Sequence, residues 1–151
     1  MDEPAGKLHH CRSCFNLRRR WMFGPLAVPF GARMLFNTIK LKPGVNFDDV
    51  EVAVGEMCNV VKETYGGDKG GFCGGQVFRF SGFASPEGSL GGVRPSDEHI
   101  AIVTYWRSFE EHERSHADKI FKDRFSALAA LSSESQELGY EMLWQGGPEP
   151  T

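Results

Sequence analysis

The sequence has no apolar run approaching the roughly 20 residues that a membrane-spanning helix needs. Its 17 Lys/Arg and 20 Asp/Glu nearly balance, so no general attraction to nucleic acid or to acidic membranes is expected. Only four cysteines are present and no secretory signal pattern precedes them, which favours reduced thiols over a disulfide framework. These features predict a cytoplasmic protein that binds neither nucleic acid nor a membrane.

The chain does have enough apolar residues for one core, since 40% of its 151 residues are hydrophobic. Residues 1–33 carry six Lys/Arg against two Asp/Glu and show no helical or alternating period. We interpret them as an extended basic N-terminal arm. Residues 34–147 are more regular and form the predicted domain, and residues 148–151 form a short tail.

The periodicity of the domain predicts strands and helices in the order βαββαβ. Asn46 is placed to cap the first helix, and Ser108 with Glu111 forms a capping box for the second. The order predicts an α+β class, a ferredoxin-like unit with both helices on one face of an antiparallel sheet. Apolar residues on both sides of the third strand predict that two sheets pack face to face as a dimeric α+β barrel, in a homodimer or a larger homo-oligomer. The predicted strands are 34–41, 72–83, 99–106 and 138–144, and the predicted helices are 47–65 and 109–131.

Two histidines lie on the second predicted helix. His112 and His116 are four residues apart, so their side chains leave one face of the helix close enough to share a ligand. Phe109, Ile120 and Leu128 fall on the same stripe, so both imidazoles are expected to face the sheet. One inward histidine is usually a hydrogen-bonded core residue. For two at this spacing, a functional pair is about as probable as a structural role in the core.

A carboxylate in the last predicted strand completes a candidate ligand set. Glu141 interrupts an apolar stretch, where a carboxylate must be paired, protonated or bound to metal unless strand alternation turns it to water. Two imidazoles and one carboxylate form the facial triad that binds Fe(II) and leaves positions open for substrate and oxygen. Zinc accepts the same donors, so these ligands leave both metals open.

Three further groups are candidates for chemistry. Cys58 lies on the inward side of the first helix, where it is either a small buried hydrophobe or a nucleophile facing the same cavity. Glu113, next to His112, is a second candidate catalytic residue. The motif HHCRSC contains Cys11 and Cys14, but a structural zinc site needs a second ligand pair, and none follows at a suitable spacing.

Three segments of the domain resemble sulfur oxygenase reductases. TYWRSFEEHERSH at 104–116 is similar to the iron-binding segment of that family, EMCNVV at 56–61 to the segment of its essential cysteine, and GYEMLW at 139–144 to the strand of its carboxylate ligand. The similarity covers about residues 34–146. It implies a mononuclear non-haem iron held by His112, His116 and Glu141, with the sulfur substrate bound to Cys58 as a persulfide.

The sequence also departs from that family. Family subunits contain two such folds in tandem, whereas this chain has one, and a further cysteine pair is replaced in the region of Ser126, Ala127 and Ala130. The resemblance implies an enzyme that uses O2 to oxidise and disproportionate elemental sulfur or polysulfide. One alternative is a monooxygenase-like barrel, cofactor-free or haem-linked, that acts on an aromatic ligand in an apolar pocket. Another is a barrel that binds a small molecule without catalysis.

Overall fold

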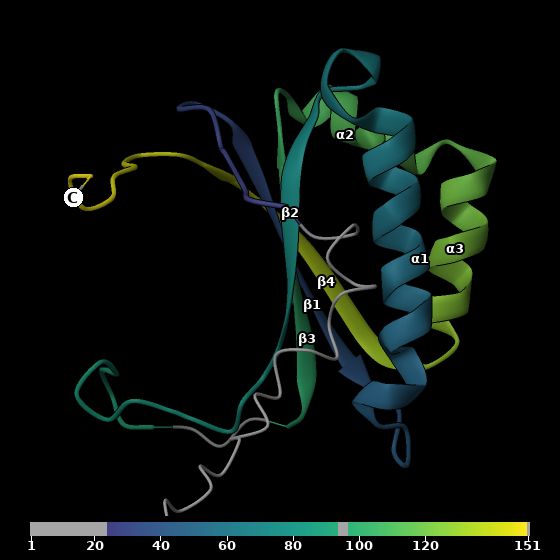
Figure 1. Ribbon diagram of the computed structural model, residues 1–151. Coiled ribbons are helices and arrows are strands. Elements are labelled where there is room, and N and C mark those ends of the chain that lie inside the picture. Colours follow the sequence, from purple (N-terminus) through teal and green to yellow (C-terminus); the bar gives the residue numbers. More distant parts are fainter. Residues whose placement is uncertain (1–23, 94–96, 151) are drawn as a thin grey trace, which may run out of the picture.

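The computed structural model describes residues 24–93 and 97–150, which form one layer of helices on one sheet (Figure 1). The α+β class and the predicted element order are confirmed. The HHCRSC motif lies outside the described residues. The elements are β1 Arg33–Leu41, α1 Phe47–Tyr65, a 3-10 turn η3 Gly67–Lys69, β2 Phe72–Arg79, β3 His99–Trp106, α2 Phe109–His116, α3 Lys119–Ala129 and β4 Ser132–Glu141.

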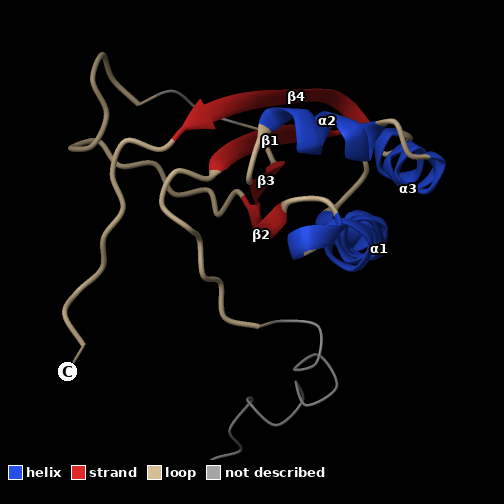
Figure 2. Cartoon of the chain, turned by 90° about the horizontal axis from the view of Figure 1, so that it is seen from above, coloured by secondary structure: helices blue, strands red, loops and turns tan. Residues whose placement is uncertain are grey.

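The four strands form one antiparallel sheet in the order β2-β3-β1-β4. Helices α1 and α3 run along one face of this sheet, and α2 lies at one end of it (Figures 1 and 2). Among the described residues no helix lies on the opposite face of the sheet, which we call the open face. No helix in the described ranges is long and apolar enough to span a bilayer.

The core fills the space between the helices and the sheet. Because strand side chains alternate, one set of β1 and β3 residues faces the helices and the other set faces away. The inward set joins the buried residues of α1 and α3. The main cluster contains Ile39, Leu41, Val50, Val54, Met57, Ile100, Ile102 and Leu128, and a smaller one toward α2 contains Leu35, Val61 and Trp106.

Helix α1 begins where the sequence predicts. Asn46 Oδ1 accepts a hydrogen bond from the Asp49 backbone N–H at 3.2 Å, and Asp49 Oδ2 accepts from the Asn46 N–H at 2.8 Å. This capping box satisfies two N–H groups that have no partner within the helix. The apolar stripe of α1 is buried against the sheet, and Cys58 is half-buried beside it.

The prediction of one continuous helix over 109–131 is wrong. Ser108 Oγ accepts from the Glu111 N–H and starts α2, but the helix ends at His116. Asp118 then caps α3, because its carboxylate accepts from the Ile120 N–H at 2.9 Å and from the Tyr65 hydroxyl at 2.5 Å. The break rotates the second half of the predicted helix, so that Ile120 is exposed rather than inward.

Strand β4 begins six residues earlier than predicted and ends at Glu141. The segment from Ser132 is polar and lacks alternating apolar residues, which is the signal that strand prediction needs. It still forms a strand because it pairs with all of β1, from Leu41 opposite Ser132 to Arg33 opposite Glu141. An edge strand can be polar because one side of it meets solvent.

Candidate active site

A cavity of about 1360 Å³ lies between the helices and the covered face of the sheet. Its walls come from α1, α2, α3 and all four strands. Much of the lining is apolar, including Val54, Met57, Ile102, Phe121 and Phe125. The polar groups on it include Asn37, Thr104, His112, His116 and Glu137.

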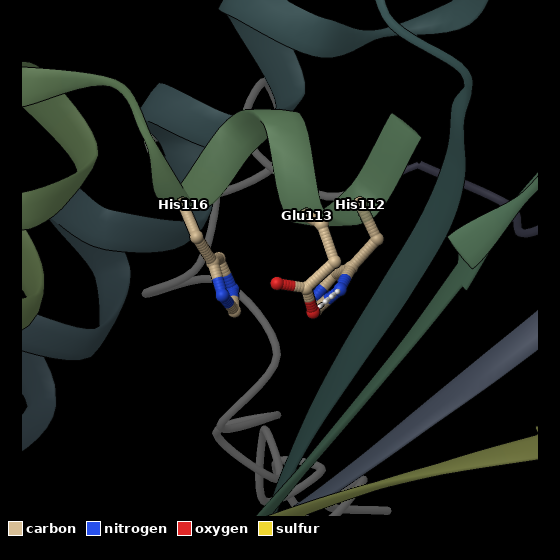
Figure 3. Close-up of side chains that lie close together, drawn as sticks. All are labelled: His112, Glu113 and His116. Atoms are coloured by element: carbon tan, nitrogen blue, oxygen red, sulfur yellow. Dashed lines mark ion pairs between the residues drawn. The ribbon is translucent and has the colours of Figure 1, made fainter. Parts of the chain in front are cut away.

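The structure brings His112 and His116 together on the inward side of α2, as the spacing predicts. Both side chains leave the helix in the same direction (Figure 3). Their ring centroids are 4.2 Å apart. His112 is buried, whereas about a third of the His116 side chain is exposed. His116 is therefore the member of the pair that a ligand in the cavity can reach.

The carboxylate that meets these histidines is Glu137. Its Oε1 lies 3.2 Å from His112 Nε2 and 3.7 Å from His116 Nε2. Asn37, opposite Glu137 on β1, donates a hydrogen bond from Nδ2 to Glu137 Oε2 at 3.4 Å. Sequence reasoning missed Glu137 because the strand was predicted to begin at Leu138. A strand begun at Ser132 would have placed Glu137 and Glu141 on the same face.

The structure does not bring Glu141, the predicted metal ligand, to the histidines. Glu141 lies four positions further along the strand than Glu137, about 13 Å at the usual rise. The intervening Gly139 lies under the Phe109 ring, which leaves no room for a Cβ there. The Glu141 side chain is 70% exposed, and its carboxylate lies 3.9 Å from the guanidinium of Arg33.

The charges around His116 and Glu137 shift both pKa values. Burial alone raises the pKa of Glu137, but hydrogen bonding and charge from His112, His116 and Asn37 outweigh it, so the pKa lies below its usual value. Burial and the neighbouring His112 lower the pKa of His116, and Glu137 and Glu113 only partly oppose them. At neutral pH the site therefore holds an ionised carboxylate beside a neutral imidazole, which can accept a proton.

Aromatic rings hold both imidazoles in place. The buried Trp106 packs edge-on against His112, with ring centroids 5.3 Å apart. Its indole N–H donates to Thr104 Oγ1 at 3.0 Å, so the ring orientation is set by a hydrogen bond as well as by packing. Phe121 stacks on His116 at 4.7 Å. These contacts reduce the motion available to the histidine pair.

The two predicted catalytic residues differ in position. Cys58 lines the cavity, but burial raises the pKa of its thiol to about 11, so it is protonated at neutral pH. A protonated thiol is a poor nucleophile, which disfavours a persulfide on this residue. Glu113 is mostly exposed, and its Oε1 lies 3.4 Å from His112 Nδ1 without hydrogen-bonding to it.

The donor atoms of this site are of the kind that bind divalent cations. One atom each from His112, Glu113 and His116 lie within 4.8 Å of one another (Figure 3). Glu137 adds a second carboxylate, whose Oε1 lies 3.2 Å from His112 Nε2. Without a cation, His112, His116 and Glu137 can still exchange protons with a ligand, because the carboxylate contacts both imidazoles.

Comparison of the sequence with family models and with curated proteins finds no match. Comparison of the fold finds SnoaB, a cofactor-independent oxygenase from Streptomyces nogalater, with a TM-score of 0.56, 17% identity, and coverage of 79% of this chain and 99% of SnoaB. A Caulobacter crescentus CB15 protein, proposed to be an antibiotic biosynthesis monooxygenase, has a TM-score of 0.57, 12% identity, and coverage of 76% and 92%. A dimeric ferredoxin-like protein of unknown function from Thermobifida fusca has a TM-score of 0.54, 9% identity, and coverage of 79% and 100%.

These likenesses show a ferredoxin-like fold of the kind found in antibiotic biosynthesis monooxygenases. They do not show a sulfur oxygenase reductase. They also correct the prediction of an iron cofactor, because an oxygenase with this fold, SnoaB, is described as cofactor-independent. The architecture therefore does not call for iron, and the assignment of iron is withdrawn.

Proposed function

We propose that this protein is a cofactor-independent oxygenase that oxidises an aromatic, phenol-like substrate inside the cavity. The observation that carries the proposal is the contact of His112 and His116 with ionised Glu137 on the wall of a large, mainly apolar cavity. The likeness of the fold to SnoaB supports it. An apolar cavity with a few convergent polar groups is the usual form of a small-molecule site.

Without a cofactor, the substrate itself must reduce oxygen. Removal of a proton from an activated ring carbon leaves a carbanion, stabilised by neighbouring phenol and carbonyl groups, that can pass an electron to O2. This transfer gives a substrate radical and superoxide. The two combine to a peroxide, which loses water to give a ketone. In balance, a ring CH2 group and one O2 give a ring C=O and one H2O, with all electrons supplied by the substrate.

The residues of the site fit the proton transfers of this reaction. His116 is the proposed general base, because it is neutral at neutral pH and reachable from the cavity. Glu137 stabilises the imidazolium that forms, as a carboxylate does when it faces a catalytic histidine. His112 and Asn37 are positioning residues, since both hydrogen-bond the Glu137 carboxylate.

The apolar walls serve the same reaction. Rings of Phe121 and Phe125 stack parallel to one another at 6.0 Å and line the cavity beside His116. Such surfaces bind flat aromatic rings and exclude water that would compete for the proton.

The open face of the sheet supports a homodimer as the functional unit. Phe36, Val103 and Tyr140 lie on this face by strand alternation, and the Phe36 and Tyr140 rings meet edge to face at 6.4 Å. An apolar sheet face needs a second layer to cover it. The likeness to a ferredoxin-like protein described as dimeric also supports this assembly.

The proposal is tested by oxygen consumption with 1,8-dihydroxyanthrone, whose ring CH2 has the required acidity. We expect turnover well above the uncatalysed oxidation, one atom of labelled oxygen in the quinone product, and unchanged rates after treatment with a strong chelator. His116→Gln should lower the rate by about 10²–10⁴-fold, the usual contribution of a general base.

The matched control is His99→Gln, because His99 stacks on Phe80 and is not among the residues that line the cavity. Its rate should equal that of the wild type. The proposal fails if the wild type does not exceed the uncatalysed rate, if both histidine variants are equally active, or if chelation abolishes a rate that added metal restores.

A further inference from the structure

Two segments extend from the sheet toward the side that has no helices. They are the connection after β2, described over residues 80–93, and the C-terminal segment 142–150 (left side of Figure 1). They leave the sheet at opposite ends. We name them the loop clasp and the C-terminal clasp.

Both clasps carry large apolar side chains in solvent. On the C-terminal clasp, Leu143 is 93% exposed and Trp144 is 79% exposed. On the loop clasp, Phe83 is 76% exposed and Leu90 is fully exposed. Single exposed apolar residues are common, but a tryptophan and a leucine side by side beyond an apolar sheet face indicate an interaction surface.

The C-terminal clasp is held at its base. The Gln145 side-chain amide donates to the Val28 carbonyl at 2.8 Å, which joins the clasp to the segment before β1. Trp144 lies so close to Gly146 that a Cβ at Gly146 would be 2.7 Å from the indole ring. A partner therefore meets a partly ordered clasp, which lowers the entropic cost of binding.

We infer that the two clasps close around a second copy of this chain, with Leu143 and Trp144 packed against that copy. The inference rests on the homodimer suggested in the proposed function. The C-terminal clasp continues directly from β4, whose outward Leu138 and Tyr140 are also exposed, so exposed apolar side chains continue from the end of the sheet into the clasp.

Symmetry favours a second copy over another occupant. In a two-fold dimer each chain offers the same face and the same clasps, so every clasp meets an equivalent surface and the contact closes on itself. Lys40, which points to the open face by alternation, is paired with Asp97 at 2.7 Å and lies opposite Glu134 on β4, so the lysine on this face has acidic neighbours within its own chain.

Cross-linking identifies the occupant. The full chain carrying Trp144→p-benzoylphenylalanine is prepared in light and isotopically heavy forms, which are mixed, allowed to exchange subunits and irradiated. We expect cross-linked peptides that join light and heavy chains, with attachment to strand residues of the open face or to the loop clasp. Cross-links confined to one chain, including those to residues 1–33, or no cross-link at all, would overturn the inference.

Sedimentation equilibrium measures how much the clasp contributes. Leu143→Ala with Trp144→Ala should raise the dimer dissociation constant by about tenfold or more, since each dimer loses two such contacts. The matched control is Val52→Ala with Ile120→Ala, which removes exposed apolar side chains from the helices. It should leave the dissociation constant unchanged.

The dimer itself and the role of the clasps in it are tested separately. A wild type that stays monomeric at all concentrations would refute both the dimer and the clasps. A dimer whose dissociation constant is the same in wild type, clasp variant and control would refute the clasps alone. At concentrations where wild type and clasp variant are both dimeric, equal rates of anthrone oxidation show that the cavity of the variant is intact.

Discussion

The layer between the helices and the sheet has two regions of opposite character. Around Ile39, Ile100 and Leu128 apolar side chains fill the space. Around Asn37 on β1 and Glu137 on β4, the layer is polar and borders a cavity of about 1360 Å³. The filled region supplies the burial that stabilises the fold, whereas the polar region leaves space where chemistry can occur.

The polar region is tolerated because most of its groups have partners, although Asn37 Oδ1 and His112 Nδ1 have no hydrogen-bond partner among the described residues. A buried carboxylate or imidazole without a partner would cost several kcal/mol. Here Glu137 contacts both histidines and Asn37, and one aromatic ring packs against each imidazole. Changing one region should therefore affect stability, and changing the other should affect proton binding.

The largest expected effect is on stability in the filled region. Leu128 is fully buried, so Leu128→Ala should lower the free energy of unfolding by about 2–5 kcal/mol, measured by urea denaturation. Ile120→Ala on the same helix removes a side chain that is 54% exposed, and it should cost much less. Equal costs would contradict the assignment of the core to this region.

The next effect is on the pH dependence of the free energy of unfolding, through His116 in the polar region. The pKa of His116 is lower in the folded chain than the ordinary histidine value of 6.5, so the unfolded chain binds protons first as pH falls. Its contribution to stability is present above pH 6.5 and lost as pH falls through the lowered folded pKa. His116→Gln should therefore lose less unfolding free energy than the wild type between pH 7 and pH 5. A steeper loss in the variant would mean that His116 is charged in the folded state.

A smaller effect distinguishes Glu137 from Glu141, two carboxylates on the same face of β4. Glu137 raises the pKa of His116, so Glu137→Gln should lower that pKa further, measured by NMR titration of the imidazole carbon. If His116 is the general base, the acid limb of the pH–rate profile should move to lower pH by the same amount. Glu141→Gln, the matched change four residues along the strand, should move neither. A shift of His116 in the Glu141 variant would return that residue to the site.

The smallest effect is on stability at Glu141. Its carboxylate lies 3.9 Å from Arg33 at the exposed end of the strand. Exposed pairs of this kind contribute roughly 0–1 kcal/mol, so Glu141→Gln should change the free energy of unfolding by no more than about that amount. A loss comparable with that of Leu128→Ala would show that Glu141 is buried in the assembled protein.

The sequence by itself determined the features that depend on neighbours along the chain. The capping box at Asn46, the start of α2 at Ser108 and the shared direction of His112 and His116 follow from spacings of three and four residues in a helix. The element order also follows, because β1, α1 and β3 have a clear apolar period and a capping residue marks the start of α2. These features need no knowledge of what lies across the sheet.

Only the tertiary structure decided which carboxylate meets the histidines. Glu137 and Glu141 share a strand face, and the choice between them depends on the register of β4 on β1 and on the place where α2 crosses the strand. Both are set by contacts between residues about 100 positions apart, as between Asn37 and Glu137. At the break after α2, Asp118 makes one contact that is local, with the Ile120 N–H, and one that crosses the fold, with the Tyr65 hydroxyl. A local pattern cannot encode such partners, because the energy that selects them exists only once distant segments have packed together.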